Sequence, residues 1–236
     1  MSDSLVIIPT YNEKENVESI VGAVLEQNHP FHILIVDDNS PDGTQDIVKK
    51  LQEEFPEQLH LHPRAGKLGL GTAYLEGFKI ALDKGYDFVF EMDADFSHNP
   101  KDLVRLREAC VKGADMSVGS RYCKGGRVSN WPMNRILMSY FASLYVRLIL
   151  WIPTKDATAG FICYTSKVLK TINLNRVSFI GYAFQIEMKY RAHKNGFFVQ
   201  EVPITFVDRR FGVSKMSMGI FKEAVLGVIK MKFMKL

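Results

Sequence analysis

The sequence predicts an α/β protein in which a mostly parallel central sheet is flanked by helices on both faces. Three observations lead to this fold class. Short, nearly wholly apolar segments alternate with longer amphipathic segments through the first half of the chain. Polar residues directly follow three of the apolar segments. The 236 residues, 47% of them hydrophobic, suit one larger domain or at most two small ones and exclude a disordered chain.

The elements of the first half follow in order. Segment 5–9 is rich in branched apolar residues and ends at Pro9, which is typical of a buried strand. The same reasoning predicts strands at 31–36, 59–62 and 88–92. Apolar residues at helical spacing predict helices over 12–25, 44–55 and 102–112, and a further helix that carries Ala73, Phe78 and Leu82. This alternation predicts a doubly wound unit.

The alternation is looser in the second half. Segment 136–152 is apolar nearly all round, and 182–195 has the pattern of a helix. Segment 197–206 reads as one strand interrupted by Pro203. A final helix is predicted over 217–236. We expect these parts to add sheet, helices and loops to the first unit rather than to form a second core.

The charges are divided unequally between the two halves. Residues 1–100 carry 18 acidic and 7 basic side chains, whereas residues 101–236 carry 8 acidic and 23 basic ones. The net charges of −11 and +15 indicate two kinds of partner for the two ends of the protein.

Other features of the chain indicate its compartment. Cys110, Cys123 and Cys163 fit neither a disulfide framework nor a zinc site, which favours a reducing cytosol. The start of the chain lacks the pattern of a signal peptide. The longest run without a charged residue, 136–146, is too short to span a bilayer, so we expect no transmembrane segment.

Polar side chains gather where three of the predicted strands end. Segments 9–13, 37–44 and 93–95 follow the strands at 5–9, 31–36 and 88–92. Because ligands of open α/β sheets bind beyond the carboxyl ends of the strands, these residues predict a ligand site. The glycine-rich segment 66–71 has neither the dinucleotide-binding spacing nor that of a phosphate-binding P-loop.

Asp93 and Asp95 form a DxD triplet directly after a strand. Two carboxylates suffice to bind Mg²⁺ or Mn²⁺ when the phosphates of a nucleotide substrate complete the coordination. The alternative is an ordinary solvated turn, and Tyr11, Glu13 and Asp38 in the other two loops allow a similar structural interpretation. The gathering of all these residues at one edge favours a site.

Motifs spread over residues 4–216 resemble those of the polyprenyl- and dolichyl-phosphate mannosyltransferases, which are family 2 glycosyltransferases with the GT-A fold. They are PTYNE (9–13), DDNSPDGT (37–44), PRAGKLGLGTAY (63–74), EMDADFSHNP (91–100), GSRY (119–122), DATAGF (156–161), QIEM (185–188) and EVPITFVDRRFGVSK (201–215). The resemblance implies a nucleotide-sugar-binding GT-A fold and a transferase.

The resemblance also implies roles for residues on the donor side. The residues implied to bind the nucleotide sugar are Pro9, Tyr11, Glu13, Val36, Asp38, Asp93, Ala94, Asp95, Arg209 and Lys215. Asp93 and Asp95 would bind the divalent metal, Mg²⁺ or Mn²⁺. Arg209 and Lys215 would close over the donor diphosphate. Ser97 stands where some relatives carry a glutamine near the metal, and we interpret His98 as a loop residue.

The acceptor side can be read from a polar stripe. Arg135, Ser139, Ser143 and Arg147 recur every four residues along an otherwise apolar helix. Arginines on such a helix need anionic partners, and Arg121 could join Arg135 and Ser139 around a lipid phosphate. The resemblance assigns the lipid phosphate to these three positions. The alternative is that the arginines pair with core carboxylates or reach the surface, and Arg147 fits this alternative better.

Taken together, the residues and the resemblance predict an inverting hexosyltransferase. It would transfer mannose from GDP-mannose to a polyprenyl phosphate, with Asp95, Arg121, Arg135 and Ser139 most important for catalysis. The acceptor phosphate is itself the nucleophile, so alignment and cationic stabilisation carry the reaction. Alternatives are a UDP-glucose-using polyprenyl-phosphate glucosyltransferase or another family 2 enzyme, and a basic nucleic-acid-binding protein. We expect no nucleic acid as a partner.

We expect a catalytic domain over 1–216 and an amphipathic helix over 217–236. Ile220, Phe221, Ala224, Val225, Val228 and Met231 share one face of that helix. This face could lie in a membrane interface or, with equal weight, pack on the domain or a partner. Segment 136–152 is a second candidate for lipid contact. Because the chain stops after the helix predicted over 217–236, we expect a peripheral protein on the cytoplasmic face of a membrane. Some relatives need a separate membrane-anchoring subunit.

Overall fold

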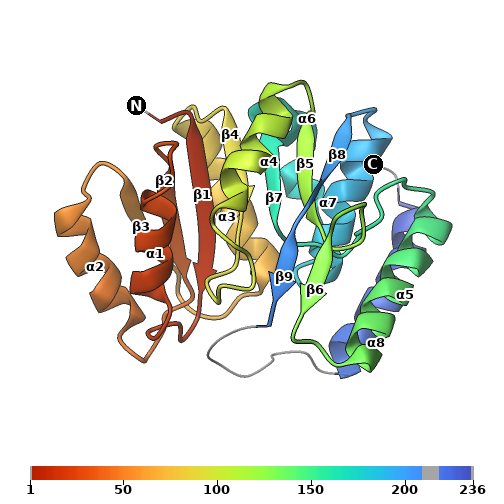
Figure 1. Ribbon diagram of the computed structural model, residues 1–236, viewed down its shortest axis with the longest axis horizontal. Coiled ribbons are helices and arrows are strands. Elements are labelled where there is room, and N and C mark those ends of the chain that lie inside the picture. Colours follow the sequence, from red (N-terminus) through yellow and green to blue (C-terminus); the bar gives the residue numbers. More distant parts are fainter. Residues whose placement is uncertain (1, 209–217, 235–236) are drawn as a thin grey trace.

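A seven-stranded sheet runs through the centre of the computed structural model, which describes residues 2–208 and 218–234 (Figure 1). Its strands lie in the order β3-β2-β1-β4-β7-β5-β8. They are β1 (Ser4–Thr10), β2 (His32–Asp37), β3 (Leu59–Pro63), β4 (Phe88–Glu91), β5 (Met116–Ser120), β7 (Ile162–Thr165) and β8 (Val199–Pro203). All neighbouring pairs are parallel except the two that involve β7, which is antiparallel to both β4 and β5.

The strand register brings the ends of the parallel strands to one edge. Thr10 at the end of β1 lies opposite Asp37 at the end of β2, and Asp37 lies opposite Pro63. Because β7 runs the other way, the segment that precedes it reaches the same edge. Residues that follow β1, β2, β4 and β5 and residues that precede β7 can therefore form one site.

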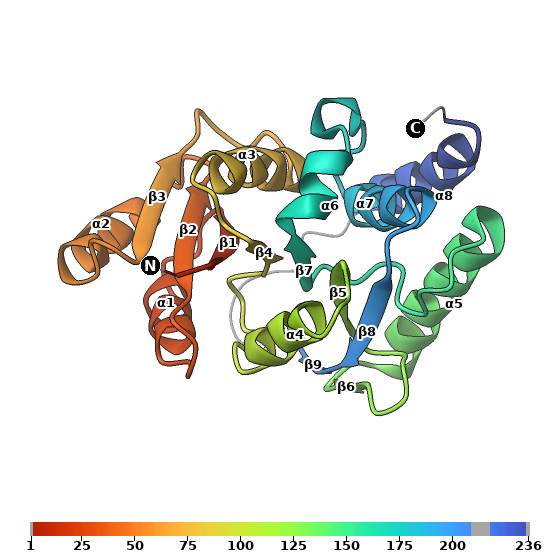
Figure 2. The same cartoon turned by 90° about the horizontal axis from the view of Figure 1, so that it is seen from above.

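Six helices cover the two faces of the sheet (Figure 2). On one face lie α3 (Leu70–Asp83), α6 (Ser166–Thr171) and α7 (Ala183–Lys194), and on the other lie α1 (Val17–Leu25), α2 (Thr44–Glu54) and α4 (Asp102–Val111). Successive residues of β1 point to alternate faces, so Leu5 and Ile7 pack on the first side and Val6 and Ile8 on the second. A strand buried on both faces must be apolar throughout, as β1 is.

Two further helices lie side by side beyond α7 (Figures 1 and 2). They are α5 (Met133–Leu150) and α8 (Met218–Lys232), and they share a third apolar cluster with α7. Val146 of α5, Ile186 of α7 and Met231 of α8 are each nearly or fully buried in this cluster. A short parallel pair of strands, β6 (Arg127–Ser129) and β9 (Thr205–Val207), lies between this layer and the sheet edge.

The predicted fold class is confirmed, since the sheet is mostly parallel and is covered on both faces. The first-half elements lie within a few residues of their expected places. The strands β5, β6 and the antiparallel β7 were not predicted from the sequence. The prediction of one strand over 197–206 was wrong, because this segment contributes to two strands in two different sheets, β8 and β9, separated at Ile204. The boundary at residue 216 stays a prediction.

Candidate active site

The loops after β1 and β2 are joined through the carboxylate of Asp37. This side chain is fully buried and accepts hydrogen bonds from Thr10 Oγ1 (2.7 Å), the Ser40 backbone N–H (2.9 Å) and Gln45 Nε2 (2.6 Å). A second bond from the Ser40 hydroxyl measures 2.6 Å. Because protein donors occupy its oxygens, Asp37 holds the edge together rather than receiving a ligand.

Side chains of the second loop also cap the backbone of the first. The backbone N–H groups of Asn12, Glu13 and Lys14 donate to Ser40 Oγ, Thr44 Oγ1 and Asp42 Oδ2 at 2.9–3.1 Å. Asn12 itself has a left-handed backbone with φ of 56°, which asparagine tolerates better than most residues. The PTYNE and DDNSPDGT motifs therefore form one interlocked structure.

Residues predicted to bind the nucleotide line this structure. Pro9, Tyr11 and Glu13 are half-buried on the first loop. Asp38, nearly buried on the second, forms an ion pair of 2.8 Å with Arg64, which follows β3. Burial raises the pKa of Asp38, although the Arg64 guanidinium opposes the shift. The side chain of Val36 is fully buried in the core, so its predicted contact would be through the backbone alone.

The sequence analysis missed Arg64. It is only 7% exposed, and its guanidinium also contacts Thr72 Oγ1 at 2.5 Å and Glu76 Oε1 at 3.2 Å. The signal was its position at the start of the PRAGKLGLGTAY motif, directly after a strand that ends at the same edge. The motif also supplies Lys67, whose Nζ lies 5.0 Å from the ring centroid of Tyr11.

The DxD residues follow β4 in a tight turn. Asp93 is half-exposed, whereas Asp95 is 9% exposed and accepts a hydrogen bond of 3.0 Å from the Ser97 backbone N–H. Phe96, which lies between Asp95 and Ser97, has φ of 59°, a left-handed conformation that costs energy for a bulky residue. The turn thereby holds Asp95 and Ser97 toward each other. Ala94 is buried beneath it.

The residues of this turn fit a divalent cation. Asp93 and Asp95 offer hard oxygen ligands, and Ser97 Oγ is buried without a hydrogen-bond partner in the described part of the chain. An orphaned buried hydroxyl beside two carboxylates suits a site that a ligand completes. Within residues 2–208 and 218–234 no cluster of three or more His, Cys, Asp and Glu side chains could bind a metal, so substrate oxygens would be needed.

His98 supports the turn and carries no charge near neutral pH. Burial lowers its pKa to about 4. Its ring stacks on Phe161 with centroids 4.8 Å apart, and its Nδ1 accepts a bond of 3.3 Å from the Asp93 backbone N–H. This agrees with the interpretation of His98 as a loop residue.

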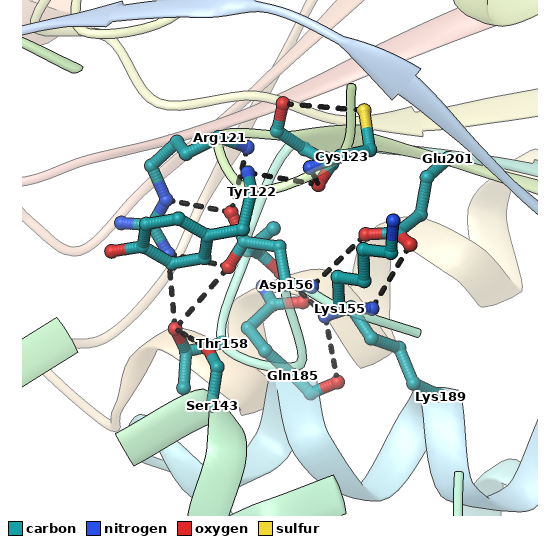
Figure 3. A network of polar contacts seen from close by, with 12 residues as sticks. Arg121, Tyr122, Cys123, Ser143, Lys155, Asp156, Thr158, Gln185, Lys189 and Glu201 are labelled. Carbon is teal, nitrogen blue, oxygen red and sulfur yellow. Dashed lines mark hydrogen bonds and ion pairs between the residues drawn. The ribbon is translucent and has the colours of Figure 1, made fainter. Parts of the chain in front are cut away.

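On the other side of the edge, Arg121 after β5 meets Asp156 before β7 (Figure 3). The Asp156 carboxylate accepts bonds from Arg121 Nε (2.7 Å), Nη2 (2.6 Å) and the backbone N–H (2.9 Å). Burial alone would raise the pKa of Asp156, but the Arg121 guanidinium holds it below its usual value. The Arg121 guanidinium therefore pairs with a core carboxylate.

The polar stripe of α5 faces the same network. Ser143 is buried, and its Oγ lies 3.3 Å from Thr158 Oγ1, which also accepts a bond of 3.0 Å from Arg121 Nη2. Arg135 forms an ion pair of 3.1 Å with Asp208. Arg147, further along, is half-buried, and its Nε has no partner among the described residues.

Three of the predicted acceptor residues are brought together. The Arg135 and Arg121 guanidinium carbons lie 3.9 Å and 5.7 Å from the ring centroid of Trp131. Ser139 follows Arg135 by one turn of α5 and is half-buried. Trp131 was not singled out from the sequence. Arg209 and Lys215, predicted to contact the diphosphate, and the neighbouring Arg210 lie outside the described residues.

The chain belongs to glycosyl transferase family 2, whose sequence pattern matches residues 5–172. This membership confirms the predicted family. It favours an enzyme over the nucleic-acid-binding alternative.

Two relatives match nearly the whole chain. The polyprenol monophosphomannose synthase of Mycolicibacterium smegmatis is 49% identical over 225 residues, which cover 95% of this chain and 85% of the relative. The undecaprenyl-phosphate mannosyltransferase of Micrococcus luteus is 45% identical over 226 residues, covering 96% and 92%.

Solved structures with low sequence identity share the fold. A mannosyltransferase from Pyrobaculum calidifontis, solved with GDP-Man and Mn²⁺, superposes with a TM-score of 0.61 at 16% identity, covering 97% of this chain and 69% of that one. The glucosyl-3-phosphoglycerate synthase of Mycobacterium tuberculosis, solved with Mn²⁺, UDP-glucose and glycerol 3-phosphate, has a TM-score of 0.70 at 15% identity, covering 97% and 79%. The predicted GT-A fold is thus confirmed.

Replacement of Asp156 by alanine is expected to lower the free energy of unfolding by about 3–5 kcal/mol, because it leaves the Arg121 guanidinium buried without its partner. The matched control is Asp46→Ala, which removes an exposed carboxylate that pairs with Lys49 at 3.8 Å and should change stability little. Urea denaturation followed by circular dichroism measures both. Equal free energies of unfolding for the two variants would contradict a stabilising role of the Arg121–Asp156 pair.

Proposed function

We propose that the protein is an inverting glycosyltransferase that transfers mannose from GDP-mannose to a polyprenyl phosphate. The observation that carries this proposal is the 49% identity to a polyprenol monophosphomannose synthase, extending over 95% of the chain. The geometry supports it, because acidic side chains and arginines line two sides of one sheet edge. A donor whose diphosphate binds a metal needs the acidic side chains, and an anionic acceptor needs the arginines.

The donor would lie over the loops after β1, β2 and β4. Tyr11, Glu13 and Asp38 would contact the nucleoside, and Asp93 and Asp95 would bind a divalent metal, Mg²⁺ or Mn²⁺, together with the diphosphate. When bound, the metal supplies positive charge to the diphosphate as it leaves. Arg209 and Lys215, by the resemblance, would add to this charge.

The acceptor would lie against α5 and the turn after β5. Arg135 and Ser139 would bind the lipid phosphate, with Arg121 beside them. The bonds of Arg121 to Asp156 and Thr158 use Nε and Nη2, which leaves Nη1 to face the phosphate. Charge-assisted bonds from guanidinium groups suit a phosphate in both charge and geometry.

The reaction would be a direct displacement. An oxygen of the acceptor phosphate attacks C1 of mannose, the bond between C1 and the diphosphate oxygen breaks, and GDP leaves with that electron pair. The phosphate is largely ionised at neutral pH, so no side chain has to remove a proton from it. Attack from the face opposite the diphosphate inverts the configuration at C1. The chain's contribution is to align two anions that would otherwise repel each other.

We further propose that α5 and α8 rest on a membrane surface, on its cytoplasmic face. Among the described residues, no helix is long and apolar enough to span a bilayer. However, Met133, Phe141 and Leu148 of α5 are 58–68% exposed. Leu226 in the middle of α8 and Phe233 just beyond its end are 67% and 82% exposed. Exposed apolar residues on adjacent helices suit an interface, with Lys230 and Lys232 near the anionic headgroups.

Part of the predicted apolar face of α8 packs against the protein itself, which was the alternative to membrane contact. Val228 and Met231 are buried against α5 and α7. The side chains of Ile220, Phe221 and Ala224 lie outside the described ones. Contact with the membrane therefore depends on the exposed Leu226 and Ile229 of α8 and on Phe233, which follows the helix. A membrane-anchoring subunit is the other partner that could cover these residues.

The first test is a transfer assay. The protein is incubated with Mg²⁺ or Mn²⁺, polyprenyl phosphate and a panel of labelled nucleotide sugars. We expect label to enter the organic phase from GDP-mannose and to a much smaller extent from UDP-glucose, and chelation of the metal should abolish transfer. Preferential transfer from UDP-glucose would support the glucosyltransferase alternative, and no transfer from any donor would refute the proposal.

Arg135→Ala should raise the KM for polyprenyl phosphate by about 10- to 100-fold, because a charge-assisted bond to the phosphate is lost. The KM for GDP-mannose should stay unchanged. Arg105→Ala serves as a control, since Arg105 pairs with Asp102 on α4. An equal rise in both KM values would remove Arg135 from the acceptor site.

The double variant Phe141→Ser and Leu148→Ser should bind roughly tenfold more weakly to vesicles that contain anionic lipid, since two exposed apolar side chains are lost. The control carries Val111→Ser and Phe198→Ser, which are each 58% exposed on other elements. Vesicle co-sedimentation measures binding. If both double variants bind equally, α5 does not form the membrane surface.

A further inference from the structure

The QIEM motif has no role in the proposed reaction, although it lies on α7, a deeply buried helix. α7 is buried on every side over ten consecutive residues. Four of these are polar, namely Gln185, Glu187, Lys189 and Arg191, and each is at most 4% exposed. Buried polar side chains require partners, and the partners of this set show what the helix fixes in place.

One pair on α7 supports a loop. Glu187 and Arg191 bond to each other at 2.8 Å. The Glu187 carboxylate accepts the backbone N–H groups of Ser178 and Phe179 at 3.0 Å, and Arg191 donates to the carbonyl of Arg176 at 2.6 Å. The bonds to segment 176–179 therefore explain why both side chains are polar.

Lys189 has a different environment. It is fully buried, and its Nζ donates to the carbonyls of Ala159 (2.5 Å) and Gln185 (3.1 Å). Within the described ranges it makes no ion pair. A buried ammonium costs several kcal/mol unless it is compensated, and an apolar side chain of similar length would fill the same space more cheaply. Packing alone therefore does not explain a lysine at this position.

The bond from Lys189 reaches the segment that holds Arg121 (Figure 3). Ala159 follows Asp156 by three residues, and Asp156 and Thr158 both bond to the Arg121 guanidinium. Glu201 of β8 fixes the start of the same segment by accepting the backbone N–H groups of residues 155 and 156 at 2.9 Å. Charged side chains thus hold this segment from both ends.

We propose that Lys189 is a positioning residue for the acceptor site. It fixes Ala159, and through Asp156 and Thr158 it orients the Arg121 guanidinium toward the lipid phosphate. Its positive charge also offsets the buried carboxylates at this edge, so that Arg121 keeps charge available for the phosphate. The inference rests on the proposed function, because it requires Arg121 to contact the acceptor.

The charged groups around Lys189 come from several elements. Glu91 of β4, Glu201 of β8 and Asp156 before β7 stabilise its ammonium form, and Arg121 after β5 opposes it. Burial lowers the pKa of His193 on α7, and the charge of Lys189 lowers it further. Burial is the largest influence and lowers the pKa of Lys189 to about 8. The side chain is therefore mostly charged at pH 7 and mostly neutral above pH 9.

The test compares Lys189→Met with Lys194→Met, a control at an exposed lysine of the same helix. Methionine keeps the length and removes the charge. Lys189→Met should raise the KM for polyprenyl phosphate by roughly 10- to 100-fold, as expected for a misplaced binding group, and leave the KM for GDP-mannose unchanged. An unchanged acceptor KM, or equal rises for both substrates, would overturn the proposal.

A double-mutant cycle tests whether Lys189 acts through Arg121. In an Arg121→Ala background, Lys189→Met should have almost no additional effect on the acceptor KM, because the group that it positions is already absent. Fully additive effects would show that Lys189 acts by another route and would refute the inference. Circular dichroism of each variant establishes that it is folded before its kinetics are compared.

If Lys189→Met does not fold, a pH series of the unaltered protein gives the answer. The KM for polyprenyl phosphate should rise severalfold between pH 7 and pH 9.5 with a midpoint near 8, while the KM for GDP-mannose stays flat. A flat acceptor KM would refute the role of Lys189. Absence of any mannose transfer by the unaltered protein would instead refute the proposed function, so the two failures can be distinguished.

Discussion

The buried pair between Arg121 and Asp156 is the interaction on which the acceptor half of the site depends. Asp156 is fully buried and Arg121 is 9% exposed, so each charge would be unstable without the other. The pair forms only because β7 is antiparallel to its neighbours and brings its preceding segment to the edge where β5 ends. The one reversed strand of the sheet therefore joins the two halves of the site.

The two sides of the site are built on different physical principles. On the donor side, hydroxyls and carboxylates cap backbone N–H groups across the loops after β1 and β2, and this leaves acidic groups at the surface for a metal-bound ligand. On the acceptor side, positive groups are held in a partly apolar environment, where electrostatic interactions are stronger than in water. The sheet edge separates the two environments, which matches the acidic and basic halves of the sequence.

Local patterns were enough to place the proposed donor-side residues at the sheet edge. Each of its residues lies within a few positions of a buried strand, so an apolar run followed by polar residues locates them, as with Asp93 and Asp95. The partners of the proposed acceptor residues could not be predicted in this way, because they are far apart in the chain. Asp156 lies 35 residues from Arg121, and β7 is a four-residue strand with no marked alternation. Arg64 was missed because its partner Asp38 lies on the loop after another strand.

The orientation of α5 links the site to the proposed membrane surface. Its polar stripe of Arg135, Ser139 and Ser143 turns toward Asp208, Thr158 and the sheet edge, whereas Leu137, Phe141 and Leu148 on the adjoining face are 48–64% exposed. On the proposed function, a polyprenyl phosphate could place its phosphate on the stripe while its chain stays beside the apolar face. Neither part of the lipid would then leave the environment it prefers. An exposed apolar face beside a polar stripe that turns toward the site suits an amphipathic substrate, so the arrangement of α5 supports the proposed lipid acceptor.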